Sequence, residues 1–296
     1  MMRTEIKKLK DLFICDDKDA KYIAAKDILG TREDGTYNSY DGELLYWAWK
    51  LVSSVSKEME QDLMFERFYK HNEERYEKYI VPFMKKINPA EFYMGSDSRS
   101  RLKYCGECPK HKVNLLPFFV GITSVTQQMY KQYDKSYLVD TEANMPATNL
   151  NWYDATMYSK WVGCRLLTEA EWEYACKSDS LELWCCPEED LDKYAWYSEN
   201  SDGVIHPVQQ TKPNQFGIFD MHGNVWEWCA DSYDENYYLT SPGESPLNNQ
   251  DKNEKVCRGG SIHAFVDMCR ASFRYYENAE FKAYDLGFRL AKSINK

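Results

Sequence analysis

Apolar residues in the first part of the chain follow a helical period. From Asp41 onward they recur every four residues, at Trp47, Leu51, Val55, Met59 and Leu63. This spacing places them on one face of an amphipathic helix, for which Asp41 is a suitable N-cap. A second, shorter stripe follows, at Tyr76, Tyr79, Ile80 and Phe83. Because proline disfavours helix at the preceding residue, the pattern predicts that this helix ends near Pro82.

From Asn88 onward the pattern changes to short apolar stretches separated by Gly, Pro, Asn and Asp. This pattern is typical of an α+β domain with long loops. It divides the chain into an N-terminal helical segment, residues 1–86, and a larger domain, residues 87–296. We expect the first segment to form a helical hairpin that packs on the larger domain or, by self-association, on a second copy of the chain.

Three helices of the larger domain have recognisable ends in the sequence. They are predicted at residues 126–133, 152–162 and 168–175. Thr126 and Asn151 can cap the first two, and Gly163 can stop the second. The third begins with Thr168 followed three residues later by Glu171, a capping box that satisfies two free amide donors.

Two segments far apart in the sequence are the clearest strand candidates, Phe118–Ile122 and Gly287–Ala291. Pairing between an early and a late segment would close the domain. The chain also contains 9 Trp, 23 Tyr and 13 Phe, so we expect aromatic rings to fill much of the core. The remaining rings must then lie on a surface.

Composition narrows the choice of partners and compartment. The formal charge of the 296 residues is -10, with no sustained cluster of Lys or Arg, which argues against nucleic acid as a partner. No stretch is apolar enough to predict a membrane span, and the first residues show no signal-peptide pattern. The ten cysteines are therefore expected to stay reduced. The expected location is cytoplasmic, with export by a route that leaves no cleavable signal as the alternative.

The order of motifs identifies a family resemblance that covers roughly two hundred residues. Eight blocks occur in sequence: INPAEFYMGS, ECPKHKV, FFVGITSVTQQMY, MPATNLNWYDATMYSKW, RLLTEAEWEYA, NQFGIFDMHGNVWEWCADSY, CRGGS and LGFRLA. This arrangement resembles the formylglycine-generating-enzyme-like, or sulfatase-modifying-factor, family. The resemblance implies an α+β fold with a C-type-lectin-like, formylglycine-generating-enzyme-type domain after the N-terminal helical segment. His111 and His222 lie inside these blocks and are expected to make structural hydrogen bonds.

Catalytic members of this family use two cysteines after the GGS block, and the resemblance implies that such a pair binds copper through soft thiolates. Here Ala264 occupies the first position and Cys269 the second. A related branch with non-haem iron adds an HxxxHxE motif, whereas the N-terminal segment contains only His71. The sequence therefore favours a non-catalytic protein. The alternatives are a copper oxidase that uses Cys269, with Ser261 beside it, or a related non-haem iron enzyme.

Two further metal sites follow from residue types. Asn224 and Glu227 could supply oxygen ligands to calcium, which some family members contain. Cys105 and Cys108 form a CxxC pair, which is half of a typical structural zinc site. The adjacent Cys185 and Cys186 could complete it, although neighbouring cysteines are an awkward second half. The alternative is that these are loop cysteines in a reducing compartment.

The strip between Gly260 and Gly287 has the composition of a recognition surface. Twelve positions carry small, aromatic, acidic or related side chains: His263, Ala264, Phe265, Asp267, Phe273, Tyr275, Tyr276, Asn278, Phe281, Ala283, Tyr284 and Asp285. Relatives that are diversified by retroelements vary at comparable places, through adenine substitution, and all twelve residues obey the resulting codon restriction.

Tyrosine and phenylalanine offer large contact areas at low entropic cost, while Asp, Asn and His orient a ligand by hydrogen bonds. The sequence therefore predicts a ligand-binding protein with a C-terminal, aromatic-rich variable surface for a protein or glycan. The alternative is that Phe273, Tyr275 and Tyr276 belong to the core.

Overall fold

The computed structural model describes residues 2–29, 41–53, 73–97, 106–140 and 142–294. The chain divides into two compact units, residues 1–81 with 153–163, and residues 82–152 with 164–296. The boundary lies between Val81 and Pro82 rather than at residue 86, because strand β1 (Met84–Ile87) already belongs to the larger unit. No helix in the described ranges has the length and apolar character that crossing a membrane requires.

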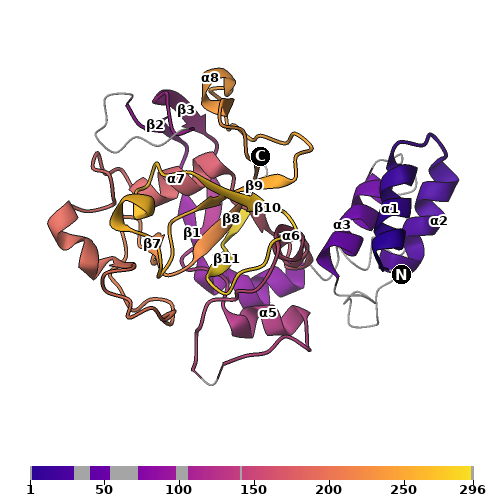
Figure 1. Cartoon of the computed structure of the whole chain (residues 1–296), viewed down its shortest axis with the longest axis horizontal. Helices are drawn as coiled ribbons and strands as arrows, with labels where there is room; N and C mark the ends of the chain where they lie inside the picture. Colours follow the sequence, from indigo (N-terminus) through magenta and orange to yellow (C-terminus); the bar gives the residue numbers. More distant parts are fainter. Residues whose placement is uncertain (1, 30–40, 54–72, 98–105, 141, 295–296) are drawn as a thin grey trace. The chain divides into compact units, whose positions relative to one another are not determined.

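The smaller unit is helical (Figure 1). It contains α1 (Met2–Phe13), α2 (Lys18–Leu29), α3 (Gly42–Ser53), η1 (Tyr76–Ile80) and most of α6 (Trp152–Trp161). The predicted cap is confirmed, since the Leu44 amide donates to the Asp41 carboxylate at 2.7 Å. Leu51 of the predicted stripe is fully buried, and its continuation at 55, 59 and 63 lies outside the described residues. The helix predicted from the second stripe is η1, and it is followed at Pro82 by a short 3-10 helix, η2 (Val81–Phe83).

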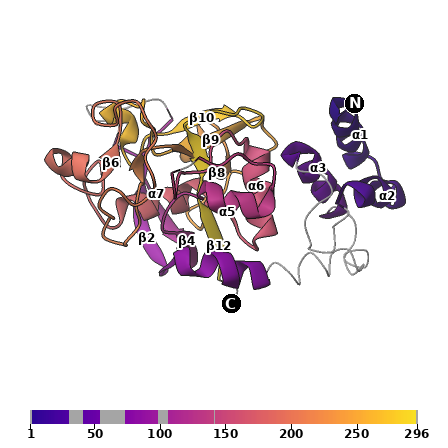
Figure 2. The same ribbon diagram turned by 90° about the horizontal axis from the view of Figure 1, so that it is seen from below.

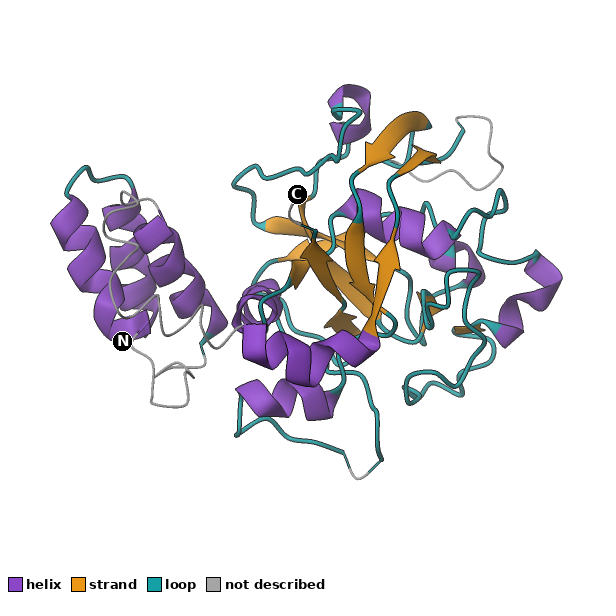
Figure 3. Ribbon diagram, turned by 180° about the vertical axis from the view of Figure 1, so that it is seen from behind, coloured by secondary structure: helices purple, strands orange, loops and turns teal. Residues whose placement is uncertain are grey.

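The larger unit is built on two four-stranded sheets and two short strand pairs. The first sheet has the order β1, β4 (Phe118–Gly121), β12 (Leu290–Ser293), β5 (Arg165–Leu166). The second has the order β10 (Tyr275–Asn278), β9 (Glu254–Arg258), β8 (Trp226–Ser232), β11 (Leu286–Phe288). The pairs are β2 (Ala90–Met94) with β3 (His111–Leu115), and β6 (Ala195–Trp196) with β7 (His222–Gly223). Figure 3 shows the two four-stranded sheets at the centre of the unit, surrounded by long loops.

The predicted closure by early and late segments is confirmed in the first sheet. β12 runs antiparallel to β4, with Ala291 opposite Val120, and the two lie side by side in Figure 2. The single strand predicted at 287–291 is wrong in one respect. It is two strands in different sheets, because β11 pairs with β8 and the chain crosses to β12 at Arg289.

The remaining helices are α5 (Gln127–Tyr133), α7 (Glu169–Lys177), α8 (Tyr237–Thr240), η3 (Glu188–Lys193) and η4 (Val266–Cys269). Thr126 caps α5, and the Thr168–Glu171 capping box of α7 has both of its hydrogen bonds. Gly163 has a φ of 72°, which a stop for α6 at this position requires. α7 packs its buried face, including Trp172, into the core beneath the second sheet. These local predictions are confirmed.

Candidate ligand-binding surface

The twelve candidate residues lie just before and within η4, just before and within the edge strand β10, and in the loop that leads to β11. Six are exposed: His263, Phe265, Tyr276, Asn278, Phe281 and Tyr284. Four are half-buried: Asp267, Tyr275, Ala283 and Asp285. The other two, Ala264 and Phe273, are each only 4% exposed and contribute packing rather than surface. We call the six exposed residues the aromatic strip. The core alternative thus applies to Phe273 but not to Tyr276.

Stacking fixes the two tyrosines of β10. Tyr276 stacks on Tyr233 with ring centroids 4.1 Å apart, and Tyr275 stacks on Trp226 at 4.9 Å. Among the strands that the structure describes, β10 pairs only with β9, in antiparallel register. Stacked rings have already lost their rotational freedom, so ligand binding here would cost little additional side-chain entropy. The half-buried Tyr233 and the buried Trp226 support this surface, although their distance in sequence gave no sign of it.

Polar contacts tie the two ends of the strip together. The Ser261 hydroxyl donates to the Asp285 carboxylate at 2.7 Å, and the His263 ring is hydrogen-bonded to the Tyr284 hydroxyl. The Trp226 amide donates to the Asp285 carbonyl at 2.9 Å, which aligns the start of β11 with β8. Residues more than twenty positions apart are therefore held as one surface. Ser261 is itself buried and has its hydroxyl committed to this contact.

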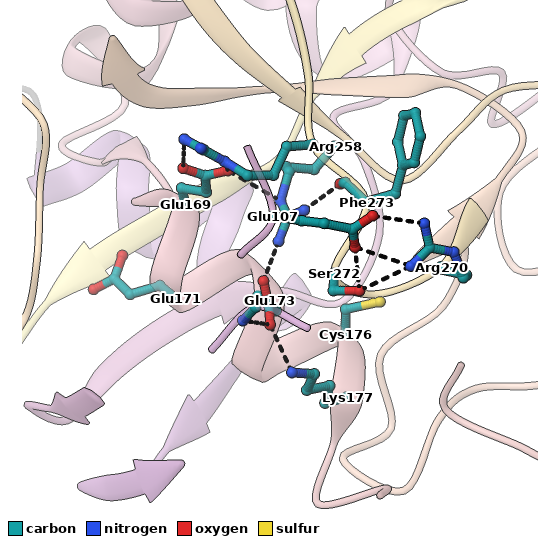
Figure 4. Close-up of polar contacts among 12 residues, drawn as sticks. Glu107, Glu169, Glu171, Glu173, Cys176, Lys177, Arg258, Arg270, Ser272 and Phe273 are labelled. Atoms are coloured by element: carbon teal, nitrogen blue, oxygen red, sulfur yellow. Dashed lines mark hydrogen bonds and ion pairs between the residues drawn. The ribbon is translucent and has the colours of Figure 1, made fainter. Parts of the chain in front are cut away.

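Buried arginines lie between the surface positions, and Figure 4 shows the contacts of one of them, Arg270. Both Arg270 Nη atoms donate to the Glu107 carboxylate at 2.9 Å, and the Ser272 hydroxyl donates to the same carboxylate. Arg274 forms a similar fork with Glu169 at 2.7 and 2.9 Å. All four charged side chains are at most 2% exposed. Two charged anchors, Arg270 and Arg274, thus fix the backbone between the exposed residues Phe265 and Tyr276.

The turn at Gly259 and Gly260 brings the two positions of the expected cysteine pair together. Gly260 has a φ of 80°, and a Cβ on it would lie 2.5 Å from the Cys269 Sγ and 3.3 Å from the Ala264 Cβ. Positions 264 and 269 therefore flank the same glycine, and only position 269 carries a thiol. Cys269 is fully buried, and burial raises the pKa of its thiol to about 12. At neutral pH this sulfur is a protonated thiol and a poor nucleophile.

A family model described as the sulfatase-modifying factor enzyme 1-like domain matches residues 70–294. The chain belongs to this family. It is 32% identical over 245 residues, 73% of its length, to the serine/threonine-protein kinase pkn1 of Chlamydia pneumoniae, and spans 39% of that protein. It is 27% identical over 275 residues to the formylglycine-generating enzyme of Streptomyces coelicolor, covering 69% of this chain and 87% of the enzyme.

Among solved structures, Treponema denticola variable protein 1 is similar with a TM-score of 0.64 at 26% identity, covering 71% of this chain and 94% of that one. The resemblance predicted from the order of motifs is confirmed. The larger unit of this sulfatase-modifying factor family member is an α+β domain of the C-type-lectin-like type, preceded by helices.

The two residues of the calcium hypothesis make protein contacts in this sulfatase-modifying factor domain. The Glu227 carboxylate is buried and ion-paired with Arg289 at 2.8 Å, and it also accepts from Trp172 Nε1 and the Ser124 hydroxyl. The Asn224 side chain exchanges two 3.0 Å hydrogen bonds with the His206 backbone. Their oxygens are committed to the fold, and a buried carboxylate opposite an arginine favours no further cation.

The cysteine candidates for zinc are only partly in view. Cys105 lies outside the described residues, and the Cys108 Sγ is 3.6 Å from the Ser96 hydroxyl. Within the described ranges, no three His, Cys, Asp or Glu side chains are grouped so that they could hold a metal ion. The backbone amide of Cys185 instead donates to His222 at 3.0 Å. The zinc pair remains a prediction from the sequence.

His222 holds the turn that carries Cys269. Its Nδ1 is 2.7 Å from the Cys269 carbonyl, and its Nε2 accepts from the Cys185 amide at 3.0 Å. This arrangement requires a neutral ring with its proton on Nδ1. Burial lowers the pKa of His222 to about 4, against 6.5 for an ordinary histidine. The expected structural role of this histidine is confirmed by these contacts.

The His222 contacts predict a specific loss of stability in acid. Below pH 6.5 the unfolded chain protonates this histidine while the folded chain does not, so the free energy of unfolding falls until about pH 4. Between these limits the loss from this one group is on the order of 3 kcal/mol. Urea unfolding at several pH values measures it, with His222→Gln as the control, because glutamine keeps one donor and one acceptor without titrating. If the free energy of unfolding fell equally steeply with decreasing pH in both proteins, the result would contradict the assignment.

Proposed function

We propose that this chain is a non-catalytic binding protein whose aromatic strip contacts a protein or glycan ligand. One observation carries the proposal: the strip displays Phe265, Tyr276, Phe281 and Tyr284 between 43% and 69% exposed, on a backbone held by buried ion pairs. A protein surface rarely leaves several large rings together without a partner. The similarity to a protein named as variable supports the same interpretation.

The strip has the chemistry of an adaptable recognition surface. Its aromatic rings supply contact area, and His263 and Asn278 supply hydrogen bonds at its margin. The half-buried Asp267 and Asp285 add negative charge below the rings. The opposite requirement, an open pair of thiolates for oxidation, is unmet at Ala264 and Cys269.

A triple substitution separates surface from core. We expect Tyr276→Ala, Phe281→Ala and Tyr284→Ala together to weaken binding by at least about tenfold, since each ring is a candidate hot spot. The probes are ligands selected by the unaltered protein from a displayed peptide library and from a glycan array. The free energy of unfolding should change little, because surface substitutions typically fall within about 0.5 kcal/mol each.

The matched control removes three other exposed apolar side chains, Tyr93, Leu181 and Leu239. This control should leave binding unchanged. Equal loss in both triple variants, or a collapse of thermal stability in the strip variant alone, contradicts the proposal. Copper-dependent oxygen consumption with a cysteine-bearing peptide would also contradict it, and would favour the copper oxidase or non-haem iron alternative.

Diversification by a retroelement is the finer part of the proposal, and the gene's surroundings test it. We expect a reverse transcriptase gene nearby, with a near-copy of the 3′ end of this gene that differs at adenines. The differences should fall in codons of the aromatic strip and avoid those of the buried anchors Arg270 and Arg274. A neighbourhood without these elements removes the diversification claim and leaves the binding claim in place.

A further inference from the structure

A cavity of about 640 Å³ opens beside the aromatic strip, next to Tyr284. Its walls come from two loops distant in sequence, one within residues 137–149 and the other at residues 203–205. Tyr284 contributes one rim of the cavity and is also part of the strip. A ligand that contacts the strip at this end therefore passes the mouth of the cavity.

Hydrogen bonds hold the cavity walls in place. The Tyr137 hydroxyl donates to the Thr148 carbonyl at 2.8 Å and accepts from the Thr148 amide at 3.0 Å. The Asn149 amide donates to the Ala283 carbonyl at 2.9 Å, directly beside Tyr284. The Gln127 amide donates to the Met145 carbonyl at 2.8 Å and fixes the floor. The cavity is thus preformed, which lowers the entropic loss on binding.

The cavity lining combines apolar walls with a single charge. Leu138 and Val204 are 88% and 54% exposed, and Met145 and Ile205 add further apolar surface. Among the lining residues, all of them within the described part of the chain, Asp140 is the one charged side chain. The Asp140 carboxylate accepts a hydrogen bond from the Gln127 side-chain Nε2 at 2.8 Å. The Asp140 backbone amide donates to the Gln127 side-chain Oε1 at 2.7 Å. These two bonds orient the carboxylate and leave further lone pairs for a ligand.

We propose that this cavity binds an arginine side chain of a protein partner, an inference that rests on the proposed function of the strip. The aliphatic part of arginine fits against Leu138 and Val204, and its guanidinium can pair with Asp140 while facing the Tyr284 ring. Arginine suits such a site better than lysine, because its planar head is less strongly hydrated and stacks on aromatic rings. The net charge of -10 also favours a partner with a basic surface.

The test uses the full chain and three blocked pentapeptides, with arginine, citrulline or lysine as the central residue between alanines. Methyl resonances of Leu138 and Val204 are followed by NMR during titration. We expect the arginine peptide to shift these resonances and to bind at least about fivefold more tightly than the citrulline peptide, which has the same shape without the charge. Asp140→Asn should reduce the arginine affinity by a similar factor, while the exposed Glu188→Gln should not.

The outcomes separate this inference from the proposed function. Equal shifts with arginine and citrulline, an arginine affinity unaffected by Asp140→Asn, or no shifts at all would each overturn the arginine site. The double variant Tyr276→Ala with Phe281→Ala reports on the strip independently, because neither residue lines the cavity, whereas Tyr284 does. Unchanged binding of the selected ligands by this double variant, together with an intact arginine response, would overturn the proposed function alone.

Discussion

Replacing Glu107 with alanine lowers the free energy of unfolding by about 3–5 kcal/mol, because it removes the carboxylate that faces the buried Arg270 guanidinium. Both side chains are fully inaccessible to solvent, and their charged atoms meet at 2.9 Å. The Ser272 hydroxyl would lose its acceptor in the same step. Urea unfolding at neutral pH measures the change, and it should rank among the largest single-residue effects in the chain.

Two controls show whether the buried charge is responsible. Asp190→Ala removes a carboxylate from the exposed pair with Lys193, where water screens the charges, and should have little measurable effect. The double variant Glu107→Met with Arg270→Met should be considerably more stable than the single variant, since neither buried charge remains. A single variant that loses less than about 1 kcal/mol would show that Arg270 finds another partner or reaches water.

The helix ends could be predicted because their causes are local. Thr168 and Glu171 are three residues apart, so the capping box forms within one turn and needs no distant partner. The strand at the end of the chain was harder. Residues 286–291 are continuously apolar except at Arg289, so the sequence shows one strand. The crossing between two sheets at Arg289 is visible only in the strand pairings and in the ion pair of Arg289 with Glu227, sixty-two residues away.

The residue types of the candidate site could be predicted from the sequence, but which of these side chains are exposed could not. The sequence does not reveal that Phe273, two residues before β10, is buried whereas Tyr276 in that strand is exposed. Tyr276 stacks on Tyr233, which lies far away in the sequence. The residues of the calcium prediction illustrate a related point. Glu227 and Asn224 are suitable ligand types, but partners distant in sequence had already taken their oxygens. Residue type indicates chemistry, and the long-range contacts decide whether a ligand can use it.

Replacing Ala264 with cysteine should create a copper(I) site. The two thiols would flank Gly260, since a Cβ on that glycine would lie 3.3 Å from the Ala264 Cβ and 2.5 Å from the Cys269 Sγ. Soft thiolates favour copper(I), and the second sulfur makes ligation intramolecular. We expect copper(I) affinity to rise on the order of 10³-fold over the unaltered protein. Competition with a coloured copper(I) chelator measures it, and the affinity should increase with pH because the buried thiol must lose its proton.

The control for this gain is Ala264→Ser, which adds similar volume at the same buried position without a thiol. It should show the packing penalty of the substitution, about 1–3 kcal/mol, and no gain in copper binding. Ala264→Cys combined with Cys269→Ser should return copper affinity to that of a single thiol. If Ala264→Cys alone gains no copper, the two positions do not converge in solution. The alanine at the first position of the pair would then not be the main obstacle to a copper site, and the buried environment of Cys269 would be the stronger barrier.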